Sequence, residues 1–201
     1  METSCIILAG GKSSRLENDK VLETVGNRSL LQRVISGVSL LSNDIIIVTA
    51  SEQTVPECID YPKLRIVTDI CPGKGPLGGI YTGLATSTSF YNLVVASDMP
   101  FLNQALLRYM IQLSANFDLV VPQMGNLVEP LHAVYTKRCL APIEQMIKQD
   151  KLSVNQLFRL VKVRYVEAEE MERFDPKHLS FFNINTKADL KRARELARGC
   201  E

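Results

Sequence analysis

The chain has 201 residues, and its 23 Lys plus Arg against 22 Asp plus Glu give a formal net charge of +1. Because proteins that bind nucleic acid through their charge show a basic surplus, this balance argues against a nucleic-acid partner. With 46% hydrophobic and 22% charged residues, the composition is that of a globular protein with a core of its own.

Five cysteines lie far apart, at positions 5, 58, 71, 139 and 200, and no Cys-x-x-Cys pair is present. This spacing predicts reduced thiols in a reducing compartment, not a zinc site. No apolar run approaches the ~20 residues of a membrane span, and the first residues do not resemble a signal peptide. We therefore expect a soluble cytoplasmic protein with no membrane partner.

Short apolar runs alternate with helical patterns, which is typical of βαβ units and a mainly parallel sheet covered on both faces. The predicted strands of this part are Cys5–Ala9, Ile45–Thr49, Leu64–Val67, Asn92–Ala96 and Leu119–Pro122. A helix follows the capping box of Ser29 and Gln32 and extends to Leu41, and another follows Pro100.

The last third of the chain is more mixed. We expect strands at Leu131–Tyr135 and Val161–Val166 and a helix at Pro142–Lys148. Thr186 and Asp189 form a capping box for a final helix, and the charged run at 167–173 indicates a solvated helix face. Because no repeat or linker divides the chain, we predict one three-layer α/β/α domain over residues 1–201.

An apolar strand near the N-terminus ends in Gly10-Gly11 and is followed by the cations Arg15 and Lys20. Glycines at the carboxyl end of a parallel strand let backbone N–H groups approach phosphate oxygens, so the segment indicates a phosphate-binding loop. The alternative is a tight turn with exposed charges.

Two common phosphate-binding motifs do not fit this loop. A Walker A motif needs a glycine five positions before Gly11, where the chain has Ile6. The dinucleotide fingerprint needs glycines at two positions that are occupied by Lys12 and Arg15. The loop therefore belongs to neither class.

Residues 8–20 read LAGGKSSRLENDK. This segment resembles the loop of the molybdenum cofactor guanylyltransferase family (molybdopterin-guanine dinucleotide biosynthesis protein A), whose pattern is Leu-Ala-Gly-Gly-x-Ser-x-Arg-Met-Gly-x-Asp-Lys. Leu16 replaces the Met, and Glu17 replaces the Gly that follows it. The resemblance implies a Rossmann-like sheet of the nucleotide-diphospho-sugar transferase type and a nucleotidyltransferase activity.

A second glycine cluster, TDICPGKGPLGGIYTGL at residues 68–84, resembles the segment that the same family places after its third strand. By this resemblance the Asp69 carboxylate accepts from guanine N1–H and the exocyclic amine, and Gly78 and Gly79 border the second substrate. The alternative is that Gly79 and Gly83 simply allow a helix to pack closely on the sheet.

A carboxylate follows the apolar strand of LVVASDMPFL, residues 93–102. In the family, the corresponding Asp-x-Pro motif holds Mg²⁺, which implies that Asp98 is the metal ligand of this chain. The alternative is that Asp98 caps the helix that follows.

Two further segments, EPLHAVY at 129–135 and FFNINT at 181–186, resemble family motifs on the pterin side. By resemblance, His132, Asn183 and Asn185 line that side of the cleft. The alternatives are a hydrogen-bonded core histidine, and turn and cap chemistry for the two asparagines.

Together these motifs imply transfer of GMP from GTP to the terminal phosphate of molybdopterin, with Mg²⁺ as cofactor and pyrophosphate as product. The implied catalytic residues are Arg15, Lys20 and Asp98. The implied GTP-binding residues are Leu8, Ala9, Gly10, Gly11, Ser13, Arg15, Lys20, Asp69 and Asp98. Molybdoenzyme chaperones or other cofactor-biosynthesis proteins are further candidate partners. The alternatives are a cytidylyltransferase or another enzyme of the superfamily, and a GTP-binding adaptor without turnover.

Overall fold

Strands and helices alternate along much of the computed structural model, which describes residues 1–9, 23–42, 44–50, 61 and 63–198. The strands are β1 (Thr3–Leu8), β2 (Thr24–Val25), β3 (Arg28–Ser29), β4 (Ile45–Thr49), β5 (Leu64–Thr68), β6 (Tyr91–Ala96), β7 (Leu119–Met124), β8 (Leu127–Val128), β9 (His132–Thr136) and β10 (Val163–Val166). The helices are α1 (Leu30–Val38), α2 (Gly75–Thr86), α3 (Gln104–Leu113), α4 (Leu140–Lys148), α5 (Val154–Leu157), α6 (Ala168–Met171) and α7 (Lys187–Arg198). The predicted α/β class is confirmed.

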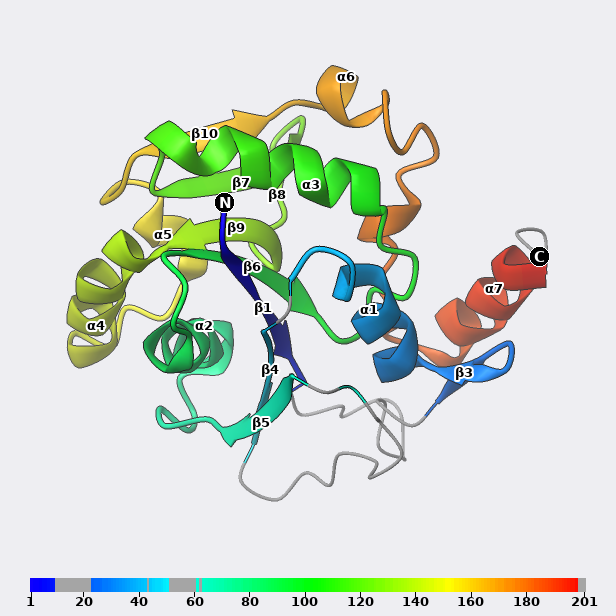
Figure 1. Ribbon diagram of the computed structural model, residues 1–201, viewed down its shortest axis with the longest axis horizontal. Coiled ribbons are helices and arrows are strands. Elements are labelled where there is room, and N and C mark those ends of the chain that lie inside the picture. The colour runs from blue at the N-terminus through cyan, green and yellow to red at the C-terminus, as the bar shows by residue number, and fades with distance from the viewer. Residues whose placement is uncertain (10–22, 43, 51–60, 62, 199–201) are drawn as a thin grey trace.

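One mixed sheet forms the centre of the molecule, in the order β10-β7-β9-β6-β1-β4-β5, with β8 paired to β7 (Figure 1). Strand β1 is parallel to β4 and β6, and β4 is parallel to β5. Strand β9 runs antiparallel to both of its neighbours, β6 and β7. The start of β9 therefore lies beside the carboxyl end of β6, although the two are far apart in sequence.

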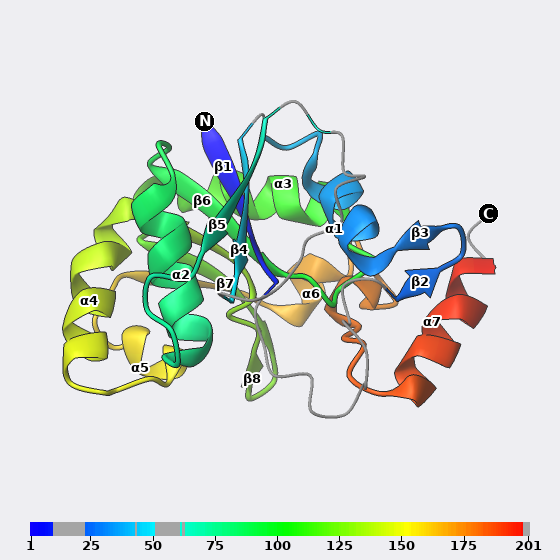
Figure 2. The same cartoon turned by 90° about the horizontal axis from the view of Figure 1, so that it is seen from below.

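Helices cover both faces of the sheet, as the nearly continuous apolar strands predict. Alternate residues of β1 point to opposite sides, so Ile7 packs with α1 and α3, whereas Ile6 packs with α2 and α4. The two sets of helices lie on opposite sides of the sheet in Figure 2. No helix in the described part of the chain is long and apolar enough to cross a membrane.

The C-terminal helix α7 packs on the β2–β3 hairpin, away from the centre of the sheet (Figure 2). Its predicted capping box is confirmed, because Asp189 N–H donates to Thr186 Oγ1 and Thr186 N–H donates to the Asp189 carboxylate. Arg194 Nε donates to Thr24 O at 2.9 Å. The last helix therefore holds the hairpin that directly follows residues 10–22.

The charged run at 167–173 differs from a fully solvated helix face. Met171 is fully buried, and Glu170 pairs with Arg164 at 2.7 Å. The Tyr109 hydroxyl also donates to Glu170 Oε2 at 2.6 Å. The run is amphipathic, and Glu170 connects α6 to α3 through its hydrogen bond with Tyr109.

Candidate functional site

The predicted site residues gather at the carboxyl ends of the central strands, which the register of the sheet brings to one edge. Ala9 N–H donates to Val48 O, and Asp69 N–H donates to Thr49 O. Asp98 lies two residues after Ala96, the last residue of β6, and Ala96 pairs with Leu8 of β1. In parallel α/β sheets this edge is where ligands bind.

Leu8 and Ala9 are buried at the end of β1. The other predicted residues of the N-terminal loop, Gly10, Gly11, Ser13, Arg15 and Lys20, lie outside the described residues. Their roles therefore stay predictions, although β1 delivers the start of the loop to the carboxyl edge.

The side chain of Asp69 is fixed by two hydrogen bonds to one of its oxygens. Oδ1 accepts from the Thr82 hydroxyl at 2.7 Å and from Cys71 N–H at 2.9 Å. No partner for Oδ2 is present among the residues that the structure describes. The sequence motifs gave no role to Thr82, which is fully buried and orients this carboxylate.

The glycines between β5 and the last turn of α2 have two different roles. Gly73 and Gly75 have φ values of +79° and +61°, a left-handed conformation that favours glycine. A Cβ on Gly79 would lie 3.2 Å from a Leu8 methyl, and one on Gly83 would lie 2.4 Å from an Ile6 methyl. The close-packing interpretation of these two helix glycines is therefore confirmed.

Gly78 and Gly79 are buried in the first turns of α2. A Cβ on Gly78 would lie 2.7 Å from the carbonyl oxygen of Cys71, so this glycine also permits a tight backbone contact. Their predicted place beside the second substrate stays a prediction.

Asp98 lies between β6 and α3 and is partly buried. It does not cap α3, because the N-cap of that helix is Asn103, whose side chain accepts from Leu106 N–H. Asp98 O instead accepts from Ile184 N–H at 3.0 Å, which brings the FFNINT segment to the carboxyl edge. The capping alternative is therefore wrong.

Glu129, to which the sequence motifs assigned no role, joins this cluster. Its Oε1 accepts from Leu131 N–H at 3.2 Å. Burial raises the pKa of Glu129, and the negative charge of Asp98 raises it further. Two carboxylates from different loops therefore interact electrostatically at this edge.

His132 is fully buried at the start of β9, with its ring centroid 4.8 Å from that of Phe181. Neither ring nitrogen has a hydrogen-bond partner among the described residues. Burial lowers the pKa of His132 to about 4, against the opposing effect of the Asp175 charge. It is a core histidine but not a hydrogen-bonded one, and its contact with a substrate stays a prediction.

The two predicted asparagines differ in their surroundings. Asn183 is half-buried, and within the described ranges its Oδ1 is buried without a partner. Asn185 is exposed, and its N–H donates to Asp189 Oδ2 at 3.0 Å, as the capping alternative expects. Asn183 is the asparagine whose side chain lies in the carboxylate cluster.

No group of three or more His, Cys, Asp or Glu side chains in the described part of the chain is arranged to hold a metal. The cluster instead offers the carboxylates of Asp98 and Glu129 and the orphaned Asn183 Oδ1. An all-oxygen donor set of this kind suits a hard cation such as Mg²⁺. The residues present therefore fit the predicted metal.

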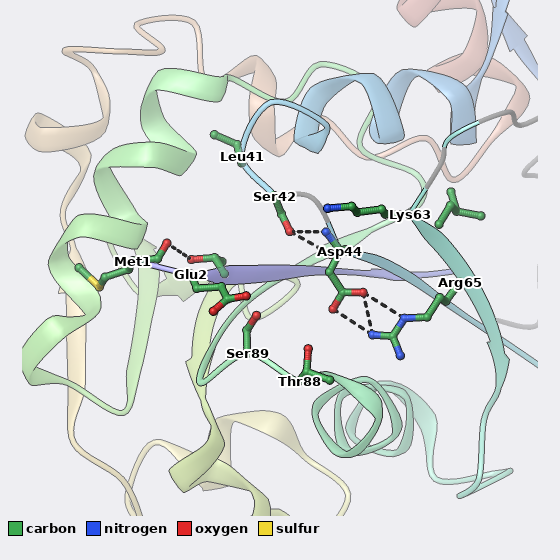
Figure 3. A pocket seen from close by; sticks show the side chains of 11 residues that line it. Met1, Glu2, Leu41, Ser42, Asp44, Lys63, Arg65, Thr88 and Ser89 are labelled. Atoms are coloured by element: carbon green, nitrogen blue, oxygen red, sulfur yellow. Dashed lines mark hydrogen bonds and ion pairs between the residues drawn. The ribbon is translucent and has the colours of Figure 1, made fainter.

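The opposite edge of the sheet carries a pocket of about 640 Å³ at the amino ends of the strands (Figure 3). Its walls hold an ion pair in which Arg65 Nη2 lies 2.7 Å from Asp44 Oδ1 and 2.9 Å from Oδ2. Ser4 Oγ donates to Asp44 at 2.6 Å and lies 2.9 Å from Ser89 Oγ. These polar groups bind one another, so they form a network that stabilises this edge of the sheet.

Comparison with known proteins places this geometry in one family. The family model for a MobA-like NTP transferase domain matches residues 5–167. A probable molybdenum cofactor guanylyltransferase of Pelotomaculum thermopropionicum is 36% identical, over 98% of this chain and 94% of the relative. A molybdenum cofactor guanylyltransferase of Desulfosudis oleivorans is 34% identical, over 94% and 92%.

Solved structures show the same fold over nearly the whole chain. Molybdopterin-guanine dinucleotide biosynthesis protein A of Archaeoglobus fulgidus superposes with a TM-score of 0.84 at 26% identity, covering 98% of this chain and 99% of that one. The 2-C-methyl-D-erythritol 4-phosphate cytidylyltransferase of Thermus thermophilus gives 0.72 at 17% identity, with 98% and 100% covered, and shows the fold alone. The chain therefore belongs to the MobA-like NTP transferase family, whose members are nucleotidyltransferases.

Proposed function

We propose that this protein transfers GMP from GTP to the terminal phosphate of molybdopterin, forming molybdopterin guanine dinucleotide and releasing pyrophosphate. The observation that carries the proposal is that Asp69 and Asp98 follow the carboxyl ends of β5 and β6, at the same edge of the sheet as the end of β1. Relatives at 34–36% identity are named as guanylyltransferases of this cofactor, which supports the same assignment.

Guanine recognition falls to Asp69. Thr82 and Cys71 hold one carboxylate oxygen, so the other is turned to accept from N1–H and the exocyclic amine of guanine. Cytosine has no N–H pair of this kind on one edge, because its ring N3 is an acceptor. This chemistry favours GTP over CTP.

The triphosphate lies along the N-terminal loop. Backbone N–H groups of Gly10 and Gly11 hold phosphate oxygens, and Arg15 and Lys20 neutralise charge on the leaving pyrophosphate. Leu8, Ala9 and Ser13 complete the GTP site. Because the reactants are both anionic, the main tasks of the protein are to reduce their repulsion and to hold the attacking oxygen in line with the α-phosphorus.

Asp98 is the residue that would hold Mg²⁺. The ion, when bound, supplies positive charge to the phosphate oxygens and acts as a Lewis acid. A carboxylate alone would repel the nucleotide, so the place of Asp98 next to the end of β1 supports a cation at this point.

The second substrate is assigned to the side of the cleft that β9 and the FFNINT segment form. The residues proposed to contact the pterin are Gly78, Gly79, His132, Asn183 and Asn185. We also propose a single domain over residues 1–201 that works in the cytoplasm, where free thiols such as Cys5, Cys71 and Cys139 stay reduced. Docking to molybdoenzyme chaperones fits this proposal.

The test is release of pyrophosphate by the purified protein with GTP, molybdopterin and Mg²⁺, run in parallel with CTP. We expect turnover with GTP and at least ten-fold less with CTP. Calorimetric titration with each nucleotide separates binding from turnover. Preference for CTP would identify a cytidylyltransferase, and GTP binding without pyrophosphate release would identify an adaptor.

A further inference from the structure

Asp150 follows α4, in a segment to which the sequence motifs assigned no role. Its φ of +55° is left-handed, a conformation that favours glycine. Asp150 N–H donates to Ile147 O at 3.1 Å, and Lys151 N–H donates to Met146 O at 2.9 Å, which are the paired bonds of a Schellman C-cap. Glycine is the residue that usually occupies this position in the motif, so the aspartate side chain needs an explanation of its own.

The carboxylate of Asp150 binds Lys74, which lies 76 residues earlier in the chain, and Lys74 Nζ donates to Asp150 Oδ1 at 2.8 Å. Strand β9 ends at the amino edge, because it is antiparallel to β6, and α4 runs back from there toward the carboxyl edge. Helix α2 begins at the carboxyl edge after β5, and the two helices lie side by side in both views (Figures 1 and 2). The pair therefore joins the end of α4 to the start of α2.

Lys74 belongs to the turn of residues 71–75, which leads from the Asp69 region into α2. Lys74 N–H donates to Cys71 O at 3.2 Å, and Cys71 N–H donates to Asp69 Oδ1 at 2.9 Å. Both glycines of this turn have positive φ, and α2 has no side-chain hydrogen bond at its N-cap. Because glycine loses more conformational freedom on ordering than any other residue, a side-chain anchor on the turn favours its ordered form.

We propose that Asp150 is a positioning residue that holds the 71–75 turn through Lys74, and that the turn in turn fixes the Asp69 carboxylate for guanine. The inference rests on the proposed function, which assigns guanine recognition to Asp69. Asp150 acts through Lys74 and does not itself touch the nucleotide. The side chains of Lys74 and Asp150 are 35% and 74% exposed, so the effect of the pair on nucleotide affinity is a few-fold and not a complete loss.

Amide hydrogen exchange tests the anchor without any nucleotide. Asparagine accepts the left-handed backbone but carries no charge, so we expect Asp150→Asn to speed exchange in a peptide covering residues 71–75 by roughly two- to five-fold. Lys74→Arg, which keeps the ion pair, retains the wild-type rate. Glu144→Gln is the matched control, because it breaks an exposed pair with Lys148 on the same helix and leaves the peptide unchanged. A wild-type exchange rate in Asp150→Asn would overturn the proposal.

Calorimetric titration with GTP tests the effect on the site. Asp150→Asn raises Kd for GTP by roughly two- to five-fold, and the difference from wild type shrinks at high salt, which screens an exposed pair. In the double variant Lys74→Met/Asp150→Asn, Kd matches that of either single variant, because the two residues act as one unit. A loss in Lys74→Met far beyond that in Asp150→Asn would show that Lys74 binds the nucleotide itself, and the positioning role would be wrong.

Asp150→Gly separates positioning from a merely structural role. Glycine relieves the left-handed backbone, so the urea midpoint stays equal to that of wild type or rises. The carboxylate is lost in the same variant, so Kd for GTP rises as in Asp150→Asn. Stability and affinity therefore respond differently to this one change. A midpoint that falls together with the affinity would assign Asp150 a structural role and reject the proposal.

The experiments separate this inference from the proposed function. If the wild-type protein binds no GTP, the proposed function and the guanine-directed part of the inference both fail. The exchange rates still decide whether Asp150 holds the turn. If GTP binds and is turned over, but neither exchange nor Kd responds to Asp150→Asn, only the positioning role fails.

Discussion

The two edges of the sheet carry similar polar side chains, but those side chains are satisfied in different ways. At the amino edge, Asp44, Arg65 and Ser4 bind one another, and among the described residues one buried acceptor there, Asn92 Oδ1, lacks a partner. At the carboxyl edge, the ring nitrogens of His132 and the Oδ1 of Asn183 have no partner in the described ranges. Polar groups that bind one another stabilise the fold, whereas buried groups without partners lower its stability.

The largest expected effect is on turnover. Asp98→Ala removes the carboxylate proposed to hold Mg²⁺, and we expect kcat to fall about 10²–10³-fold with the fold intact. Pyrophosphate release measures the rate, and circular dichroism checks the fold. Lys20→Ala, in the loop outside the described residues, has the same expected loss.

Glu144→Ala is the control for Asp98→Ala, because Glu144 is an exposed carboxylate paired with Lys148 on α4. It keeps wild-type turnover. Wild-type kcat in folded Asp98→Ala would remove the main difference between the two edges, since the carboxyl edge would then hold no essential group.

The next effect is a pH dependence of stability caused by His132. Its pKa is about 4 in the folded protein and about 6.5 in the unfolded chain, so only the unfolded chain gains a proton between these values. Stability is therefore lost as the pH falls through this window. We expect a loss of about 2–3 kcal/mol between pH 7 and pH 4.5 that His132→Leu does not show.

Urea unfolding at the two pH values measures this difference. Val134→Ala, a buried neighbour on β9, is the control, because it lowers the free energy of unfolding equally at both pH values. If wild type and His132→Leu lose stability in parallel, His132 is not the group that titrates.

The smallest effect lies at the amino edge. Asp44→Ala breaks the pair with Arg65 and removes an acceptor of Ser4, and we expect a loss of about 1–2 kcal/mol in the free energy of unfolding. The value is modest because 41% of the Arg65 side chain is exposed. Calorimetry should give an unchanged Kd for GTP. A weaker Kd would show that the two edges are coupled.

The sequence predicted the central fold because its patterns are local. The bounds of β4, Ile45–Thr49, are those that the apolar run predicts, and both predicted capping boxes form. The short pairings of β2, β3 and β8 carry no periodicity long enough to find. The C-terminal end of α1 is Val38 and not Leu41, because Ser39 already caps the helix.

The sequence predicts the site residues that belong to a motif. It does not predict residues whose role depends only on tertiary contacts. Asp69 and Asp98 follow strands, so their common edge can be read from the chain. Thr82 acts through Asp69, a partner in another segment, and no local pattern marks such a pair. The antiparallel direction of β9, which brings Glu129 to the end of β6, likewise depends on the whole sheet.

The docking of α7 on the β2–β3 hairpin has a consequence for synthesis of the protein. Residues 10–22 are made early, but the hairpin that follows them is held by Arg194, near the end of the chain. During translation the central strands can pair long before residues 187–198 have left the ribosome. The nascent chain therefore pairs its central strands first and docks α7 on the β2–β3 hairpin last.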